Sequence, residues 1–321
     1  PGAPPWTVDM PGSSLLLAQW SGLAGASTLS AQLLSVALTT AGVGLMWACF
    51  APELPAAAAF AAVAVAAINP LTASISGTVL SDIPFFCITL LVFMAARSIW
   101  EKGSQGAWAG LGALAGAAFL IRPTGAAFVL SLLAALAWER RRRLAACCAA
   151  GAALVAIPWL VRNLMVSGMV LPYASQLAAS WNVGGLLERL TRNAAFYGPE
   201  LFWRTLFRWP AWPGAALLKW TTVVLGLAAV AAGLREWGTK GWRKFMIAFF
   251  AGYAVLHLQL HLQSGRYVYT FLPMAVPLLF LGLDAADRRL ALKGRLVLGA
   301  AALSLILSLG PVAHIVRTSL W

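Results

Sequence analysis

The chain has 321 residues, of which 61% are hydrophobic and only 10% are charged, and its mean hydropathy is +0.81. A soluble domain has no use for so much apolar surface, so the composition excludes the soluble classes and indicates a polytopic membrane protein. The net charge of +13 does not indicate nucleic-acid binding, because no basic soluble module with interleaved aromatic residues carries it.

The N-terminal segment, residues 1–27, is a Pro-rich stretch rather than a hydrophobic leader, and we predict an extracytoplasmic loop followed by a juxtamembrane segment. It begins Pro1-Gly2-Ala3 without a methionine and contains no signal peptide. We therefore expect that the natural N-terminus is missing, with room there for one more spanning helix.

Long apolar runs occupy most of the remaining chain. A bilayer core of about 30 Å requires about 20 apolar residues per helix, and somewhat fewer inside a bundle. The sequence therefore predicts an all-α, polytopic transmembrane bundle of about ten helices, rich in the alanine and glycine that allow close helix packing. The predicted spans are residues 28–50, 54–70, 82–99, 107–121, 124–138, 144–161, 214–233, 243–262, 268–285 and 294–316. The short fourth and fifth spans are hinged at Arg122-Pro123-Thr124-Gly125.

One long segment, residues 163–213, separates the N-terminal helices (28–162) from the C-terminal helices (214–321). It is too polar to span a membrane and too aromatic for a free loop, which predicts interfacial amphipathic helices. Arg204 and Arg208 share a helix face. Plain membrane anchoring and a lipid-phosphate cradle over a chamber mouth both fit this pattern. Its aromatic and basic residues are Trp181, Arg189, Arg192, Phe196, Tyr197, Phe202, Trp203, Arg204, Phe207, Arg208, Trp209 and Trp212.

Basic residues in short loops set the predicted orientation. Counting alternate crossings, four basic groups fall on one side, which the positive-inside rule makes cytoplasmic. The same count places Asp82, Arg122, Arg162, Arg266 and residues 163–213 on the extracytoplasmic face. The basic groups are Arg97 and Lys102; Arg140 to Arg143; Arg235, Lys240, Arg243 and Lys244; and Arg288, Arg289, Lys293 and Arg295. The four cysteines lie inside apolar runs with neither metal-site nor disulfide spacing, so we expect small buried side chains.

Asp82 is the first candidate for chemistry, because an ionised carboxylate next to hydrocarbon costs several kcal/mol and is by default a functional candidate. Pro84 fits the first turn of a helix, whose positive N-terminal end would keep Asp82 ionised. Asp82 is interpreted either as a structural partner for an arginine or as a carboxylate that binds an acceptor hydroxyl, a metal or a sugar.

Three arginines lie on the same predicted face and suit a large anionic lipid headgroup. Arg266 follows Ser264-Gly265 and precedes Tyr267, a pair able to bind phosphate, although a snorkelling interfacial arginine fits equally. Arg162 with Asn163 closes one span, and Arg122 stands at a helix break.

His257 and His261 lie four residues apart and share a helix face. Two such histidines are half a metal site, and no HExxH context completes it. With Gln259 and Gln263 interspersed, a polar lining is favoured. No cofactor is predicted with certainty, and a divalent metal stays open.

The motifs in their order resemble the GT-C superfamily of integral-membrane glycosyltransferases. The nearest resemblance is to the bacterial family of dolichyl-phosphate-mannose-protein mannosyltransferases and aminoarabinose transferases, and it covers nearly the whole chain. The motifs are Asp9-Met10-Pro11-Gly12, Asn69-Pro70, Ser81-Asp82-Ile83-Pro84, Gly112 through Arg122-Pro123, Pro158-Trp159-Leu160-Val161-Arg162-Asn163, and His257 through Arg266-Tyr267 and Pro273.

This resemblance implies an inverting sugar transfer from a polyprenyl-phosphate-linked donor to a lipid, glycan or protein acceptor, on the outer face of a bacterial inner membrane. Asp82 matches the family's second acidic position. The phosphate ligands implied are Arg266, Tyr267, Arg162, Asn163 and Arg122, with His257 and His261 as further lining. Membrane lipids are the other expected partners, and no nucleic acid is expected.

One departure from the family concerns its principal acidic motif, which normally stands upstream of the Pro-Gly segment. Only Asp9 occupies that region, so either Asp9 substitutes for the main base or that base was lost with the N-terminus. A transporter or flippase for a lipid-linked sugar is the alternative, although the paired broken helices typical of transporters are not apparent. A structural or assembly protein would leave Asp82 and the arginines unexplained.

Overall fold

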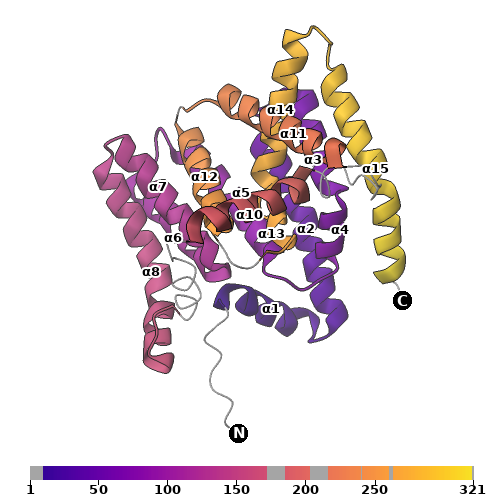
Figure 1. Cartoon of the computed structure of the whole chain (residues 1–321). Helices are drawn as coiled ribbons and strands as arrows, with labels where there is room; N and C mark the ends of the chain where they lie inside the picture. Colours follow the sequence, from indigo (N-terminus) through magenta and orange to yellow (C-terminus); the bar gives the residue numbers. More distant parts are fainter. Residues whose placement is uncertain (1–9, 172–184, 203–215, 240, 260–262, 320–321) are drawn as a thin grey trace. The chain divides into compact units, whose positions relative to one another are not determined.

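The computed structural model describes residues 10–171, 185–202, 216–239, 241–259 and 263–319 (Figure 1). All regular elements in these ranges are helices. Each of the predicted spans contains a helix. Within the described residues, five helices are long and apolar enough to cross a membrane, or six if the bent pair α3 and α4 is one span. The predicted all-α membrane class is thus confirmed, while the number of crossings stays a prediction.

The chain divides into two compact units. Unit 1 comprises residues 1–26, 91–193 and 240–262, and unit 2 comprises residues 27–90, 194–239 and 263–321. Two of the boundaries fall inside helices, one in α5 (Asp82–Ile99) and one in α10 (Leu186–Pro199). Unit 1 also contains α1 (Pro11–Ala24), α6 (Gln105–Ile121), η1 (Pro123–Gly125), α7 (Ala126–Trp138), α8 (Arg142–Ser167) and α12 (Trp242–Gln259). Unit 2 also contains α2 (Thr28–Phe50), α3 (Ala56–Ala67), α4 (Pro70–Ser76), α11 (Ala216–Trp237), α13 (Arg266–Tyr269), α14 (Leu272–Arg289) and α15 (Arg295–Ser319).

Close packing of α6 and α8 organises unit 1, and both helices pack against α7. A Cβ added at Gly112 would overlap the carbonyl oxygen of Cys148, and one at Gly151 would overlap that of Ala109. The two helix backbones are therefore in direct contact, which only residues without a side chain permit. Around α7 and α12 the core is aromatic, and the rings of Phe128 and Phe249 stack with centroids 3.8 Å apart.

Charged residues gather at one end of unit 1. Glu139, just after α7, pairs with Arg141 (Nε to Oε2, 3.1 Å) and with Lys244 near the start of α12 (Nζ to Oε1, 3.2 Å). Trp100, after α5, donates from its indole nitrogen to the same carboxylate at 3.2 Å. Members of two of the predicted basic groups, Arg141 and Lys244, thus meet at one end of this unit, although the side of the membrane stays a prediction.

Unit 2 is organised by contact of α11 with α14, where a Cβ on Gly233 would overlap the carbonyl oxygen of Leu278. Its charged end lies where α11 and α14 finish, with Arg288 bound to Glu236 at 3.0 Å. There the buried Asp287 accepts the backbone N–H groups of Gly294 and Leu296, both at 2.7 Å, and so caps the start of α15.

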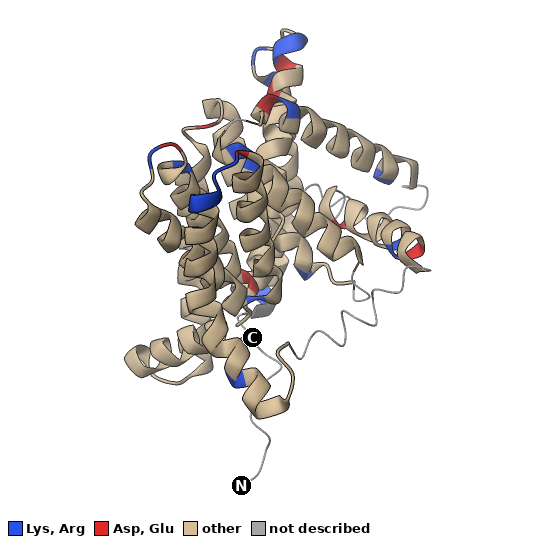
Figure 2. Ribbon diagram, turned by 90° about the vertical axis from the view of Figure 1, so that its left-hand side faces the viewer, with Lys and Arg blue, Asp and Glu red and all other residues tan. Residues whose placement is uncertain are grey.

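The helix directions place the candidate residues away from these charged ends. In unit 1, α6 begins beside Trp100, since Trp100 and Trp108 have ring centroids 5.3 Å apart, and it runs for 17 residues (about 25 Å) before Arg122. In unit 2, Gln32 near the start of α2 donates to the carbonyl of Gly77, before α5, at 3.2 Å. Figure 2 shows most charged residues at helix ends and in connections, with the helix bodies largely uncharged.

Four free cysteines occur in the described residues. Cys49, Cys87 and Cys148 are buried, as expected of small apolar side chains, whereas Cys147 is partly exposed.

Candidate functional site

Asp82 is the first residue of α5, and its side chain is buried, with 1% of the residue exposed. The helix starts at this point because the carbonyl of Ser81 accepts the backbone N–H of Phe85 at 3.1 Å, and Pro84 follows in the first turn. This confirms the predicted position of Asp82 in the first turn of a helix. The positive end of the helix dipole stabilises the carboxylate there.

Next to Asp82 lies the short helix α13. Tyr269 is buried and stacks on Phe86, one turn after Asp82, with ring centroids 5.1 Å apart. It also hydrogen-bonds the side chain of Thr39 and lies within electrostatic range of Asp82. These contacts bring α13, which begins with Arg266, to the start of α5.

Arg266 and Tyr267 occupy the first two positions of α13. Arg266 is exposed and lies over the Tyr267 ring, 5.5 Å from its centroid, while Tyr267 is partly buried. The preceding residue, Gly265, lies against Glu200, because an added Cβ would be 2.6 Å from its Oε1. A carboxylate therefore stands beside the start of this Arg-Tyr segment.

In unit 1, Arg122 is the buried C-cap of α6, with extended backbone (φ −147°, ψ 140°). Proline at the next position favours that conformation, which ends the helix. At Gly125 the chain passes directly against the backbone of Ala118, and a Cβ there would overlap it. The predicted hinge is therefore present, and close backbone contact fixes its geometry.

Arg162 and Asn163 lie in the last turns of α8. Arg162 is exposed and stacks on Trp159, with Cζ 4.7 Å from the ring centroid. Asn163 is buried, with 1% exposed, and its backbone carbonyl accepts the Ser167 hydroxyl at 2.8 Å. Gly168, in the left-handed conformation (φ 69°), ends the helix. Arg162 is thus presented outward on a rigid helix.

His257 is 1% exposed and lies in the last turn of α12. Its Nδ1 lies 2.9 Å from the carbonyl oxygen of Tyr253, and since a carbonyl only accepts, Nδ1 carries the hydrogen in this contact. Arg122 lies close enough to interact with His257 electrostatically. The sequence missed Asn193 of α10, which is fully buried and donates from Nδ2 to the carbonyl of Leu258 at 2.8 Å.

The buried face of α10 is polar. Arg189, one turn before Asn193, is 6% exposed, whereas Leu187 on another face is 74% exposed. The predicted helix in this segment thus exists at Leu186–Pro199, and its placement in a lipid interface stays a prediction. Other predicted residues lie outside the described ranges: Asp9, Trp181, Trp203, Arg204, Phe207, Arg208, Trp209, Trp212, Lys240 and His261.

Two groups of candidates result, each within one unit. Unit 2 brings Asp82 next to α13, which carries Arg266 and Tyr267. Unit 1 brings Arg122 near His257, on the end of α12 that Asn193 of α10 contacts. Arg162 and Asn163 belong to the same end of unit 1, close to the end of α8. Among the described residues no group of three or more His, Cys, Asp or Glu could hold a metal ion.

Comparison with known proteins finds similarity to one family over the N-terminal part of the chain. Residues 8–165 match the family model described as dolichyl-phosphate-mannose-protein mannosyltransferase. No curated protein and no solved structure matches the chain. The matched segment contains Asp82, Arg122, Arg162 and Asn163, and it supports the predicted GT-C-like resemblance. Residues 8–165, just under half of the chain, are therefore similar to the dolichyl-phosphate-mannose-protein mannosyltransferase family, and this similarity supports a membrane glycosyltransferase.

Proposed function

We propose that this protein transfers a sugar from a polyprenyl-phosphate-linked donor to an acceptor on the extracytoplasmic face of a bacterial inner membrane. The observation that carries the proposal is the buried Asp82 at the N-terminus of α5, with α13 and its Arg266 beside it. In unit 2 both lie away from the charged end, which the positive-inside rule assigns to the cytoplasm.

Asp82 acts as a general base in the proposed reaction, or shares that role with Asp9. The acceptor hydroxyl gives its proton to the carboxylate as its oxygen forms a bond to the anomeric carbon, with inversion. The bond from that carbon to the lipid phosphate oxygen breaks, and the phosphate leaves as an anion. The first turn of α5 and the surrounding core fix the position of the Asp82 carboxylate.

The cations stabilise the negative charge that grows on the leaving phosphate. Arg266 is the first candidate ligand, because its guanidinium is exposed and Tyr267 beside it supplies a hydroxyl. The predicted supporting groups Arg122, Arg162 and Asn163 lie in unit 1, where His257 is near Arg122. No step of the proposed reaction requires a metal ion.

The experiment measures transfer of a labelled sugar from a panel of polyprenyl-phosphate sugars in proteoliposomes. Asp82→Asn should lower kcat at least a hundredfold with donor binding retained, as expected for loss of a general base. Arg266→Ala should lower both turnover and lipid-phosphate affinity, with partial rescue by Arg266→Lys. Glu101→Gln, at a side chain that is 72% exposed in the charged cluster of unit 1, is the control.

Two results would contradict the assignment. Unchanged turnover in both Asp82→Asn and Arg266→Ala would refute these site residues. Movement of the lipid-linked sugar across the bilayer without transfer to any acceptor would instead favour a flippase.

A further inference from the structure

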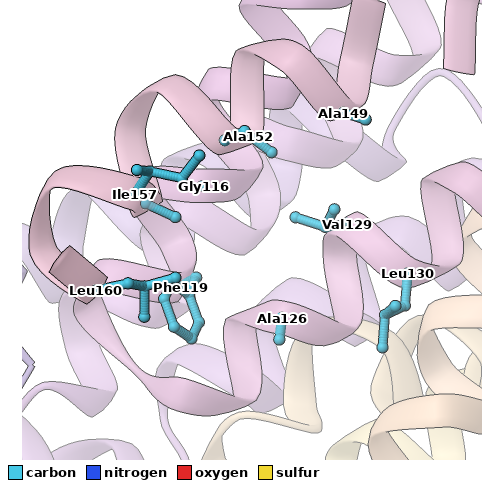
Figure 3. Close-up of a pocket in the computed structure, with 11 residues that line it drawn as sticks. Gly116, Phe119, Ala126, Val129, Leu130, Ala149, Ala152, Ile157 and Leu160 are labelled. Atoms are coloured by element: carbon cyan, nitrogen blue, oxygen red, sulfur yellow. The ribbon is translucent and has the colours of Figure 1, made fainter. Parts of the chain in front are cut away.

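An apolar cavity of about 370 Å³ opens between α6, α7 and α8 in unit 1 (Figure 3). Every residue that lines it is apolar, and most of those on α8 are alanine. A cavity without polar partners does not hold ordered water well, so its natural occupant is an apolar group. Representative lining residues are Gly116, Phe119, Ala126, Val129, Ala153 and Leu160.

The cavity is elongated along α8, and we call it the α8 groove. Its lining runs from Ala149 to Leu160 on that helix, a rise of about 16 Å. The groove is open at its rim, where Leu130 is 67% exposed and Ile157 is 51% exposed. α8 is also one of the helices apolar enough to cross a membrane, and only 17% of the residues in its apolar stretch are buried. This shape suits a hydrocarbon chain that enters from the bilayer.

One end of the groove is formed by residues that lie close in sequence to two of the candidate arginines. Phe119, which lines this end, is one turn before Arg122, and Leu160 comes two residues before Arg162. Figure 3 shows Phe119, Ile157 and Leu160 together at this end, with Ala149 at the other. The opposite end of the groove points toward the charged cluster around Glu139 and Arg141. An apolar chain with an anionic head therefore matches the groove when its head lies at the Arg122 and Arg162 end.

We propose that the α8 groove binds the isoprenoid chain of the lipid donor, with its phosphate toward Arg122 and Arg162. The identity of the lipid rests on the proposed function. Alanines at 149, 152, 153 and 156 leave a wide floor on α8, which accommodates the methyl branches of an isoprenoid. A phospholipid acyl chain is the competing occupant, and the experiments separate the two.

The first experiment measures binding of a long-chain polyprenyl phosphate and of geranyl phosphate to the purified full chain in nanodiscs. The double variant Ala149→Leu/Ala153→Leu fills the part of the groove far from Arg162, and the matched control Ala146→Leu/Ala150→Leu adds the same volume at exposed positions of α8 that do not line it. Loss of contact with about two methylene groups predicts a roughly tenfold weaker affinity of the groove variant for the long chain. Affinity for geranyl phosphate, which is too short to fill the groove, should not change, and the control should match the unsubstituted protein.

Unchanged long-chain affinity in the groove variant would overturn the proposal, as would an equal loss in the control. A second experiment uses a polyprenyl phosphate with a photoreactive group on the third isoprene from the phosphate, which lies within the groove in the proposed orientation. Crosslinks to α7 or α8 along the groove are expected, and excess phospholipid should not suppress them. Suppression by phospholipid, or crosslinks only elsewhere, would assign the groove to a bilayer lipid.

These binding measurements do not depend on turnover. Absence of sugar transfer in the unsubstituted protein would refute the proposed function. The binding data would still decide, by themselves, whether the groove binds the isoprenoid chain. Normal transfer with unaltered long-chain binding in the groove variant would refute the groove alone.

Discussion

Gly125→Ala is the substitution whose effect on the site follows most directly from backbone geometry. Gly125 has φ −61° and ψ −19°, so alanine meets no conformational strain there. The added Cβ would instead overlap the backbone carbonyl of Ala118 and approach the amide nitrogen of Phe119 at 2.5 Å. Backbone atoms in a packed helix do not rotate away, so the turn that holds Arg122 must shift.

The magnitude follows from overpacking, which typically costs about 1–3 kcal/mol in a well-packed core. We expect Gly125→Ala to destabilise the protein by about 2 kcal/mol and to weaken binding of polyprenyl phosphate, because displaced Arg122 no longer lies at its place beside the groove end. Gly110→Ala on α6 is the matched control, since nothing lies within 4 Å of its added Cβ. In a helix interior that change should be neutral or stabilise by up to about 1 kcal/mol.

The assay combines reversible unfolding in mixed detergent micelles with binding of polyprenyl phosphate to the folded fraction. Equal stability and equal binding for Gly125→Ala and Gly110→Ala would refute the argument. Destabilisation without any loss of binding would show that the turn does not position Arg122 for the lipid.

Two further predictions concern groups that hold helix ends. Asp287→Asn should destabilise the protein by about 2–3 kcal/mol, because a buried carboxylate that accepts two backbone N–H groups is replaced by an amide that accepts one of them poorly. The control Asp284→Asn, which weakens an ion pair with the half-exposed Arg288, should cost under about 1 kcal/mol. Equal unfolding midpoints for the two variants would contradict the capping role of Asp287. Asn193→Leu should loosen the end of α12, seen as faster amide hydrogen exchange near His257, because the Leu258 carbonyl loses its donor; an unaltered exchange pattern would contradict this.

Several site features were predictable from local sequence rules. The Ser-Asp-Ile-Pro pattern predicts a helix that begins at Asp82, because proline is tolerated only in the first turn and a carboxylate is favoured there. The Arg-Pro-Thr-Gly pattern predicts the break at Arg122 for an equally local reason, the extended backbone that proline imposes on the residue before it.

Other features depended on contacts between segments distant in sequence. Asn193 had no signal beyond being one polar residue in an amphipathic segment, and only packing of α10 against α12 shows that it caps a carbonyl. The contact of Glu200 with Gly265 likewise requires the fold. Helices α1, α4 and α13 were not predicted, since each is too short or too polar to register as a membrane span.

The sequence by itself determined the class of this protein, the positions of its apolar helices and the residue types available for chemistry, because hydropathy and helix-end rules act within one segment. Only the tertiary structure decided which of those residues lie close together. It put Tyr269 and α13 beside Asp82, set Arg122 near His257, and left the alanine face of α8 open as a groove. Such neighbours come from packing of glycine and alanine surfaces between helices, which no pattern within a single helix specifies.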